Sequence, residues 1–211
     1  MNFLRGNFDK ITDPESCALE PSLQLAKYQL QLGLFTKAEQ SLETLLADPA
    51  ISDSTLSQAQ FTLGKVYFVM NRYEEALSLY EKVHKRQGGD RVLVKYRQKA
   101  LANMALVKCQ SLNTKQALAL CEGVELGCLD FVDQIKHKIK TATVLKRSLC
   151  YLDALALLSD AESGVTKELV DDTCAKPHKL MKLLHKIMRD KARLNFWLKN
   201  EAQDRHFEEQ A

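Results

Sequence analysis

Histidine and cysteine are among the side chains that could act as nucleophiles, bases or metal ligands. The 211 residues include five histidines and six cysteines. The histidines are scattered, and no nucleophile, base and orienting group recur at a spacing that helices would bring together. They are His84, His137, His178, His185 and His206. We therefore expect no catalytic residue and no enzymatic activity.

Metal and phosphate sites are not predicted either. The sequence has neither a glycine-rich phosphate loop nor a His-Glu-x-x-His zinc helix. His178 and His185 are seven residues apart, two helical turns from each other, which is too far for one metal ion. No two cysteines have the spacing of a zinc knuckle. We expect no metal, no cofactor and six buried, reduced thiols, at Cys17, Cys109, Cys121, Cys128, Cys150 and Cys174.

The composition predicts an all-α protein. Hydrophobic residues make up 45% of the chain, and eight glycines with four prolines are too few for a fold of strands and turns. The formal charge of +3 favours neither a nucleic-acid-binding nor a membrane protein, although residues 61–147 carry 16 basic and 8 acidic side chains. The first residues contain no apolar run long enough for a signal peptide, and we expect no membrane span. We expect the protein in the cytoplasm or the nucleus.

Residues 57–90 carry the clearest pattern, two amphipathic helices joined by a turn at Asn71 and Arg72. Gly64 and Ala76 are small enough to let the two helices pack closely. The order Leu-Gly-x-x-Tyr, then Tyr-x-x-Ala-x-x-x-Tyr-x-x-Val, resembles a tetratricopeptide repeat, a helix-turn-helix unit of about 34 residues. The resemblance implies an all-α, right-handed α-solenoid of such repeats.

The register of this pattern occurs four times. Small residues stand twelve apart in each copy and are expected to pack its two helices together: Ala26 with Ala38, Gly64 with Ala76, Ala105 with Ala117, and Ala142 with Ala154. The second members are separated by 38, 41 and 37 residues, so extra residues lie between the repeats. We predict four tetratricopeptide-like repeats in residues 19–168, at about 19–52, 57–90, 98–131 and 135–168.

The ends of the chain are predicted to differ from the repeats. Residues 1–18 form a lead-in and a helix start, with Asp13 as the cap before Pro14. Residues 169–211 hold a basic amphipathic helix from Pro177 to about Asn200, followed by a polar tail. This helix is expected to cap the apolar end of the solenoid. As an alternative, a basic helix with Trp197 can bind an acidic membrane surface, calmodulin or nucleic acid.

The resemblance also implies a binding surface, because the first helices of such repeats line a concave groove that holds a peptide or a partner helix. The groove positions transfer to lysines, an arginine, an asparagine and two phenylalanines: Lys27, Phe61, Lys65, Phe68, Lys99, Asn103, Lys136, Lys140 and Arg147. Such a groove fits an acidic partner segment with apolar anchors. The alternative is an ordinary solvated face.

The leading hypothesis is a non-catalytic protein-interaction module, either an adaptor or scaffold or the N-terminal part of a subunit of a multiprotein complex. One alternative is a self-associating structural subunit of a large ubiquitin-ligase, transport or trafficking assembly. A less favoured one is a nucleic-acid-binding subunit that uses residues 136–147 and the C-terminal helix. We do not expect a clamp for a heat-shock chaperone tail, because Leu23 stands in place of the first clamp lysine and Asn103 in place of an arginine.

Overall fold

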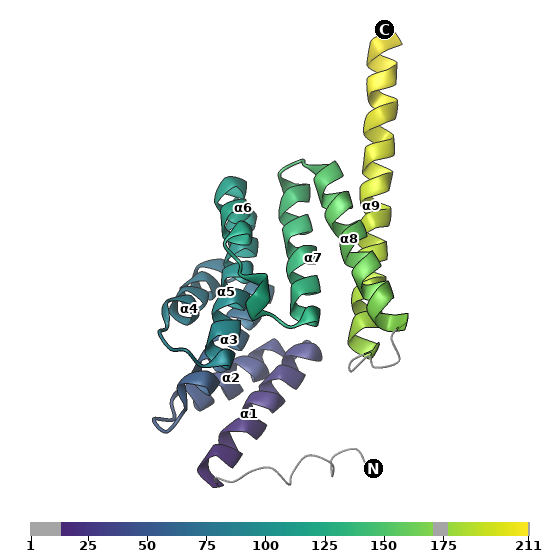
Figure 1. Cartoon of the computed structure of the whole chain (residues 1–211). Helices are drawn as coiled ribbons and strands as arrows, with labels where there is room; N and C mark the ends of the chain where they lie inside the picture. The colour runs from purple at the N-terminus through teal and green to yellow at the C-terminus, as the bar shows by residue number, and fades with distance from the viewer. Residues whose placement is uncertain (1–13, 171–176, 211) are drawn as a thin grey trace. The chain divides into compact units, whose positions relative to one another are not determined.

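The computed structural model describes residues 14–170 and 177–210, and every regular element in these ranges is a helix (Figure 1). The helices are α1 (Pro14–Gln31), α2 (Phe35–Leu46), α3 (Asp53–Val69), α4 (Tyr73–Lys85), α5 (Arg91–Gln110), α6 (Thr114–Glu122), the short 3₁₀ helix η1 (Leu126–Cys128), α7 (Phe131–Arg147), α8 (Tyr151–Val170) and α9 (Pro177–Gln210). The predicted all-α fold is confirmed. The lead-in and helix start were predicted in residues 1–18; of these, residues 1–13, with the expected cap Asp13, lie outside the described residues, and α1 begins at Pro14.

The chain divides into two compact units, an N-terminal unit of residues 1–100 and a C-terminal unit of residues 101–211. Helix α5 contributes its first half to the N-terminal unit and its second half to the C-terminal unit. None of the helices in the described ranges has an apolar stretch that would cross a lipid bilayer.

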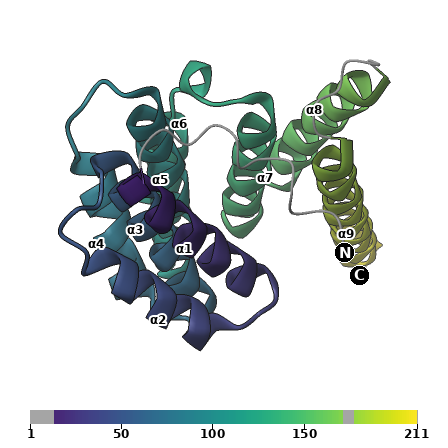
Figure 2. The same ribbon diagram turned by 90° about the horizontal axis from the view of Figure 1, so that it is seen from below.

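In the N-terminal unit, α1 packs against α2 and α3 packs against α4 (Figure 2). Small residues stand where the paired helices approach: Ala26, Ala38, Gly64 and Ala76 are all buried. The approach is tightest at Gly64, where a Cβ atom would lie 2.7 Å from Cε1 of the buried Tyr80 ring. A side chain at position 64 would therefore require the Tyr80 ring or the backbone around it to move.

The hairpin turns repeat one backbone arrangement four times. Each turn contains a residue in the left-handed region, namely Gly33 (φ 77°), Asn71 (φ 62°), Leu112 (φ 60°) and Leu149 (φ 63°). In each, the N–H of the next residue bonds the carbonyl five positions back: Leu34 to Gln29, Arg72 to Tyr67, Asn113 to Lys108, and Cys150 to Leu145, at 2.8–3.1 Å. This is the Schellman motif, which satisfies the last carbonyls of the first helix and reverses the chain.

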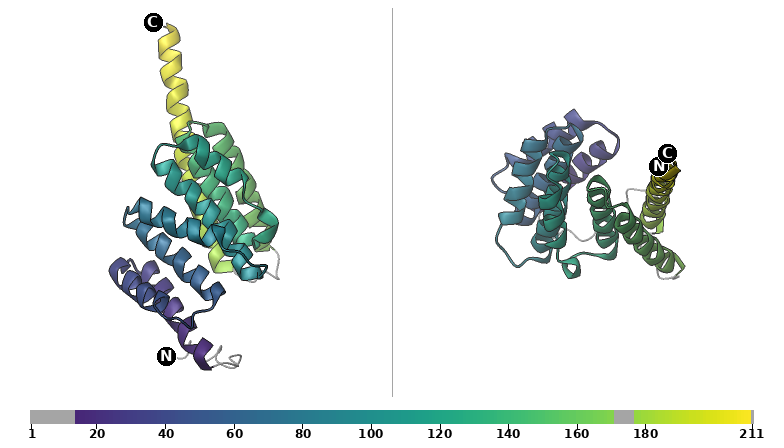
Figure 3. Two further views of the ribbon diagram at one scale, coloured as in Figure 1. Left: turned by 90° about the vertical axis from the view of Figure 1, so that its left-hand side faces the viewer. Right: turned by 90° about the horizontal axis from the view of Figure 1, so that it is seen from above.

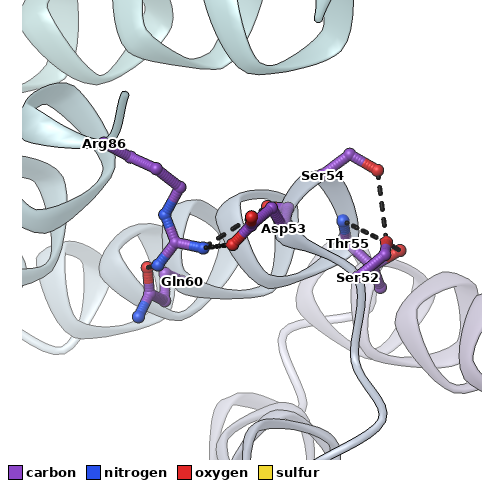
Figure 4. A network of polar contacts seen from close by, with 6 residues as sticks. All are labelled: Ser52, Asp53, Ser54, Thr55, Gln60 and Arg86. Atoms are coloured by element: carbon purple, nitrogen blue, oxygen red, sulfur yellow. Dashed lines mark hydrogen bonds and ion pairs between the residues drawn. The ribbon is translucent and has the colours of Figure 1, made fainter. Parts of the chain in front are cut away.

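The start of α3 and the end of α4 are held together by polar contacts (Figure 4). The Ser52 hydroxyl accepts a hydrogen bond from the Thr55 N–H at 3.2 Å and so caps α3. Arg86, directly after α4, donates to the Asp53 carboxylate at 3.0 Å and to Gln60 Oε1 at 3.2 Å. Asp53 and Gln60 are seven residues apart on α3. Because Arg86 bonds both of them, it holds the C-terminal end of α4 against the first half of α3.

In the C-terminal unit, α7, α8 and α9 share one core. Ile135 of α7, Leu158 of α8 and Ile187 of α9 belong to the same buried cluster. Leu180 and Leu194 lie on the buried side of α9 with Ile187, because they are seven residues from it in either direction. The expectation of a C-terminal capping helix is confirmed. Its predicted end near Asn200 is too early, since α9 continues to Gln210 and projects beyond the ends of α7 and α8 (Figures 1 and 3).

The cysteines only partly follow the prediction of buried thiols. Cys109 and Cys121 are free and buried, whereas Cys128 and Cys150 are free and half-buried. Cys128 differs because it ends the short helix η1 at the surface, and Cys150 because it lies in the turn before α8. The side chains of Cys17 and Cys174 lie outside the described residues, as does that of His206.

Candidate partner-binding surface

Gln58 joins three helices of the N-terminal unit on one surface. Its Oε1 accepts a hydrogen bond from Lys27 Nζ of α1 at 3.2 Å and another from the Tyr96 hydroxyl of α5 at 3.3 Å. Lys65 is exposed on α3 seven residues after Gln58, two turns away on the same side of the helix. We call the surface formed by Lys27, Gln58, Lys65, Tyr96 and Lys99 the α1–α3–α5 face.

Phe61 lies beneath this face rather than on it. Its side chain is only 5% exposed, and its ring packs edge-on against Tyr96, with centroids 5.2 Å apart, and against Tyr80 at 5.7 Å. Lys99 Nζ lies 4.7 Å from the Tyr96 ring centroid and 5.5 Å from that of Phe61. The expectation that Phe61 contacts a partner is therefore corrected. Phe61 instead supports Tyr96 and Lys99 from below, through ring packing and a cation–π contact.

Phe68 lies near the C-terminal end of α3 and is half-buried. Its ring packs against Tyr73 of α4 with centroids 5.6 Å apart. Val69, its neighbour in the sequence, is 48% exposed. This end of α3 therefore adds apolar surface beside the lysines.

The other predicted contact residues lie in the C-terminal unit, where internal bonds hold them. Lys140 Nζ donates to Asn103 Oδ1 at 2.6 Å, and Asn103 is only 7% exposed. Arg147 donates to the Cys109 carbonyl at 3.2 Å. Lys136 is exposed, although its Nζ donates to the Asp133 carboxylate at 3.0 Å. Asn103 is thus a packing residue, and Lys140 and Arg147 tie α7 to the second half of α5.

Burial changes the pKa values of three titratable groups in the C-terminal unit. It raises the pKa of the Cys109 thiol and of the Cys121 thiol, so both stay protonated at neutral pH. Burial, reinforced by the positive charge of Lys140, lowers the pKa of His137 to about 4. His137 is therefore neutral at physiological pH. Among the described residues, no three His, Cys, Asp or Glu side chains gather as a metal site would require.

Gln58 and Tyr96 were not identified from the sequence. Gln58 lies seven residues before Lys65, and Tyr96 three residues before Lys99, so both have the helical spacing that marks a shared side. This spacing could have indicated them. The hydrogen bonds that bring them together span 31 and 38 residues and are not visible in any local pattern.

No protein-family model and no curated protein matches the sequence. Solved structures do match the fold. The apo form of PlcR from Bacillus thuringiensis superposes with a TM-score of 0.63 at 14% identity, covering 86% of this chain and 69% of that one. Two structures of nearly identical TPR-like repeats of a putative kinesin light chain from Podosopora anserina, one of them a single-residue variant, both give 0.52 at 14% identity. The variant structure covers 92% of this chain and 97% of its own, and the other covers 86% and 92%.

The fold is tetratricopeptide-like. Helices α1 and α2, α3 and α4, and α7 and α8 are the helical hairpins of this tetratricopeptide-like chain, and each pair packs closely. The hairpin of α5 and α6 brings Ala105 and Ala117 into one buried cluster. The α1–α3–α5 face is accordingly built from the first helices of successive hairpins.

Proposed function

We propose that this chain is a non-catalytic protein-interaction module that holds an acidic peptide or helix against the α1–α3–α5 face. The observation that supports the proposal is the bridge at Gln58, whose Oε1 accepts hydrogen bonds from Lys27 of α1 and from Tyr96 of α5. Lys99 lies beside the Tyr96 ring. A scaffold or a subunit of a multiprotein complex would use such a surface.

Two lysines of this face, Lys27 and Lys99, are oriented before any partner arrives. Lys27 is held by its bond to Gln58, and Lys99 by the rings of Tyr96 and Phe61. A side chain that is already ordered loses less conformational entropy when a partner binds, which strengthens binding without added contacts. Phe68 and Val69 supply an apolar site next to Lys65. The face therefore fits a partner that carries carboxylates and a few apolar anchors.

Reversal of one charge on this face should weaken binding of an acidic partner. We expect Lys65→Glu to reduce affinity by about 10-fold for fluorescein-labelled peptides rich in Asp and Glu with Phe or Leu anchors, because the substitution places like charges opposite each other. Fluorescence anisotropy at low salt measures the dissociation constant. The same peptides with Asn and Gln in place of the acids should bind more weakly to the unmodified chain.

Lys37→Glu is the matched control, because Lys37 is also an exposed lysine but lies on α2, a second helix. It should leave peptide affinity within about 2-fold, as expected for a charge outside the contact. If Lys37→Glu and Lys65→Glu weaken binding equally, the α1–α3–α5 face is not the binding surface.

A second candidate function, that of a self-associating structural subunit, is favoured by an apolar row on and just after α1. Leu25, Tyr28 and Leu32 are 52%, 59% and 57% exposed and follow the spacing i, i+3, i+7. Large apolar side chains gathered on one side of a helix commonly mark a protein–protein contact. Two copies of the chain could cover the row by packing it against itself.

If the row joins two copies, the chain should sediment as a dimer at micromolar concentration, and Tyr28→Lys should convert it to a monomer, because a lysine at the centre of an apolar contact is costly to bury. Sedimentation velocity measures the mass. Leu152→Lys is the control, since Leu152 is also exposed but lies on α8. A monomeric unmodified chain would exclude this candidate.

A further inference from the structure

Five basic residues form a single line along α9. Lys179, Lys182, Lys186, Arg189 and Arg193 follow the spacing i, i+3, i+7, i+10, i+14, which keeps them on one side of the helix, and all five are exposed. The line is about 21 Å long at 1.5 Å per residue. We call it the basic row.

The basic row lies away from the core of the C-terminal unit. The buried side of α9 carries Leu180, Ile187 and Leu194, which pack with residues of α7 and α8. Lys191 lies nearer that side and forms an ion pair with Glu162 of α8. Within the described part of the chain, the acidic group found at the row is Asp190, at 4.0 Å from Arg189 Nε. Like charges three or four residues apart repel each other and destabilise a helix. The basic row therefore lowers the stability of α9, and an anionic partner would offset this repulsion.

Apolar side chains accompany the row on the exposed side of α9. Phe196 and Trp197 follow its last member and are 63% and 56% exposed, with ring centroids 6.4 Å apart. Met181 and Met188 are also exposed, one above the other at a spacing of seven. Phe196 and Trp197 flank the line of the basic row, whereas the two methionines lie about a third of a turn further around the helix. The row therefore has large apolar groups beside its C-terminal end.

We propose that the outward side of α9 binds a membrane surface that contains anionic lipids. The basic row contacts the headgroups, and Phe196 and Trp197 enter the boundary between headgroups and acyl chains, where aromatic rings are preferred. A straight line of cations matches a flat anionic surface, and the exposed aromatic side chains beside it gain free energy by leaving water for that boundary. This inference does not depend on the α1–α3–α5 face.

The chain carries its own reporter for this proposal, because Trp197 is its single tryptophan. Phosphatidylcholine vesicles that contain phosphatidylserine should shift the Trp197 emission to shorter wavelength, and brominated lipids should quench it. Vesicles of phosphatidylcholine alone should do neither. High salt should reverse the shift, because it screens the attraction between the row and the headgroups.

Charge-reversal variants distinguish binding through the basic row from general attraction of the vesicles to the charge of the whole chain. The triple variant Lys182→Glu, Lys186→Glu, Arg189→Glu should partition at least about 100-fold more weakly to the phosphatidylserine vesicles, since each basic residue near such a surface contributes appreciably. The control triple Lys37→Glu, Lys115→Glu, Lys167→Glu changes the net charge equally at exposed sites on three other helices. It should retain binding. Circular dichroism should show the same helicity for both variants.

Three results would overturn the proposal. The first is an unchanged Trp197 emission in the presence of phosphatidylserine vesicles. The second is an equal loss of partitioning in the two triple variants, which would mean attraction to the whole chain. The third is tighter binding of a single-stranded RNA oligonucleotide than of the vesicles at the same ionic strength, which would assign the row to nucleic acid instead.

Discussion

Gly64→Ala is expected to destabilise the N-terminal unit by about 1–2 kcal/mol, whereas Gly164→Ala is expected to stabilise the C-terminal unit by about 0.5–1 kcal/mol. Both glycines lie inside helices, α3 and α8, where alanine is the better helix former. At Gly164 the added methyl group would meet Ile135 and Phe131 at 3.8 Å, an ordinary contact. At Gly64 it would lie 2.7 Å from the buried Tyr80 ring, so overpacking outweighs the gain in helix propensity.

Urea denaturation followed by far-UV circular dichroism measures both changes. A double-mutant cycle gives the cause, because Tyr80→Leu removes the ring that the new methyl group would strike. Gly64→Ala should cost less in the Tyr80→Leu background than in the unmodified chain, a non-additivity typical of residues in contact. If the two substitutions are additive, the ring is not the reason for the glycine.

The second large effect concerns pH. The folded chain holds the pKa of His137 at about 4, below its ordinary value of 6.5. Between these values the unfolded chain binds a proton that the folded chain does not, so stability falls as the pH falls from about 6.5 to about 4. Each pKa unit is worth about 1.4 kcal/mol, and with allowance for solvent screening we expect a loss of about 2 kcal/mol over this window.

His137→Gln should remove this part of the pH dependence, since the amide does not titrate and can still bond the Thr141 hydroxyl, which lies 3.4 Å from His137 Nε2. Denaturation followed by Trp197 fluorescence, which reports on the C-terminal unit, measures stability at each pH. His185→Gln is the control, because His185 is exposed on α9. Parallel pH profiles for the unmodified chain and His137→Gln would exclude His137 as the source.

Much of the fold was predictable because steric demands appear directly in the sequence. Gly64 and Ala76 could be recognised since two helices approach closely only at small residues, and Pro177 could be recognised as a helix start since its missing N–H costs nothing there. The sequence predicts the end of α9 too early, because a polar composition is typical of a fraying tail but does not by itself end a helix. Residues 200–210 contain neither glycine nor proline, and nothing in them ends a helix.

The binding surface was less predictable because it depends on contacts between repeats. Phe61 occupies a groove position of α3, yet Tyr96 of the next first helix covers it, across 35 residues of sequence. Asn103 is likewise hidden by its bond to Lys140, 37 residues away. A pattern within one helix gives the side on which a residue lies. It does not show which residue of a neighbouring helix will cover that side chain.

The left-handed turns have a consequence for redesign. The same hydrogen-bonded turn is formed with glycine and asparagine in the N-terminal unit but with Leu112 and Leu149 in the C-terminal unit. A leucine held in this conformation costs about 1–2 kcal/mol relative to the right-handed region, a penalty that glycine does not carry. The chain therefore keeps the shape of these turns by backbone bonding and does not require a favourable residue there. In an engineered version of the array, glycine in place of Leu112 or Leu149 would remove this conformational penalty and should stabilise the folded chain.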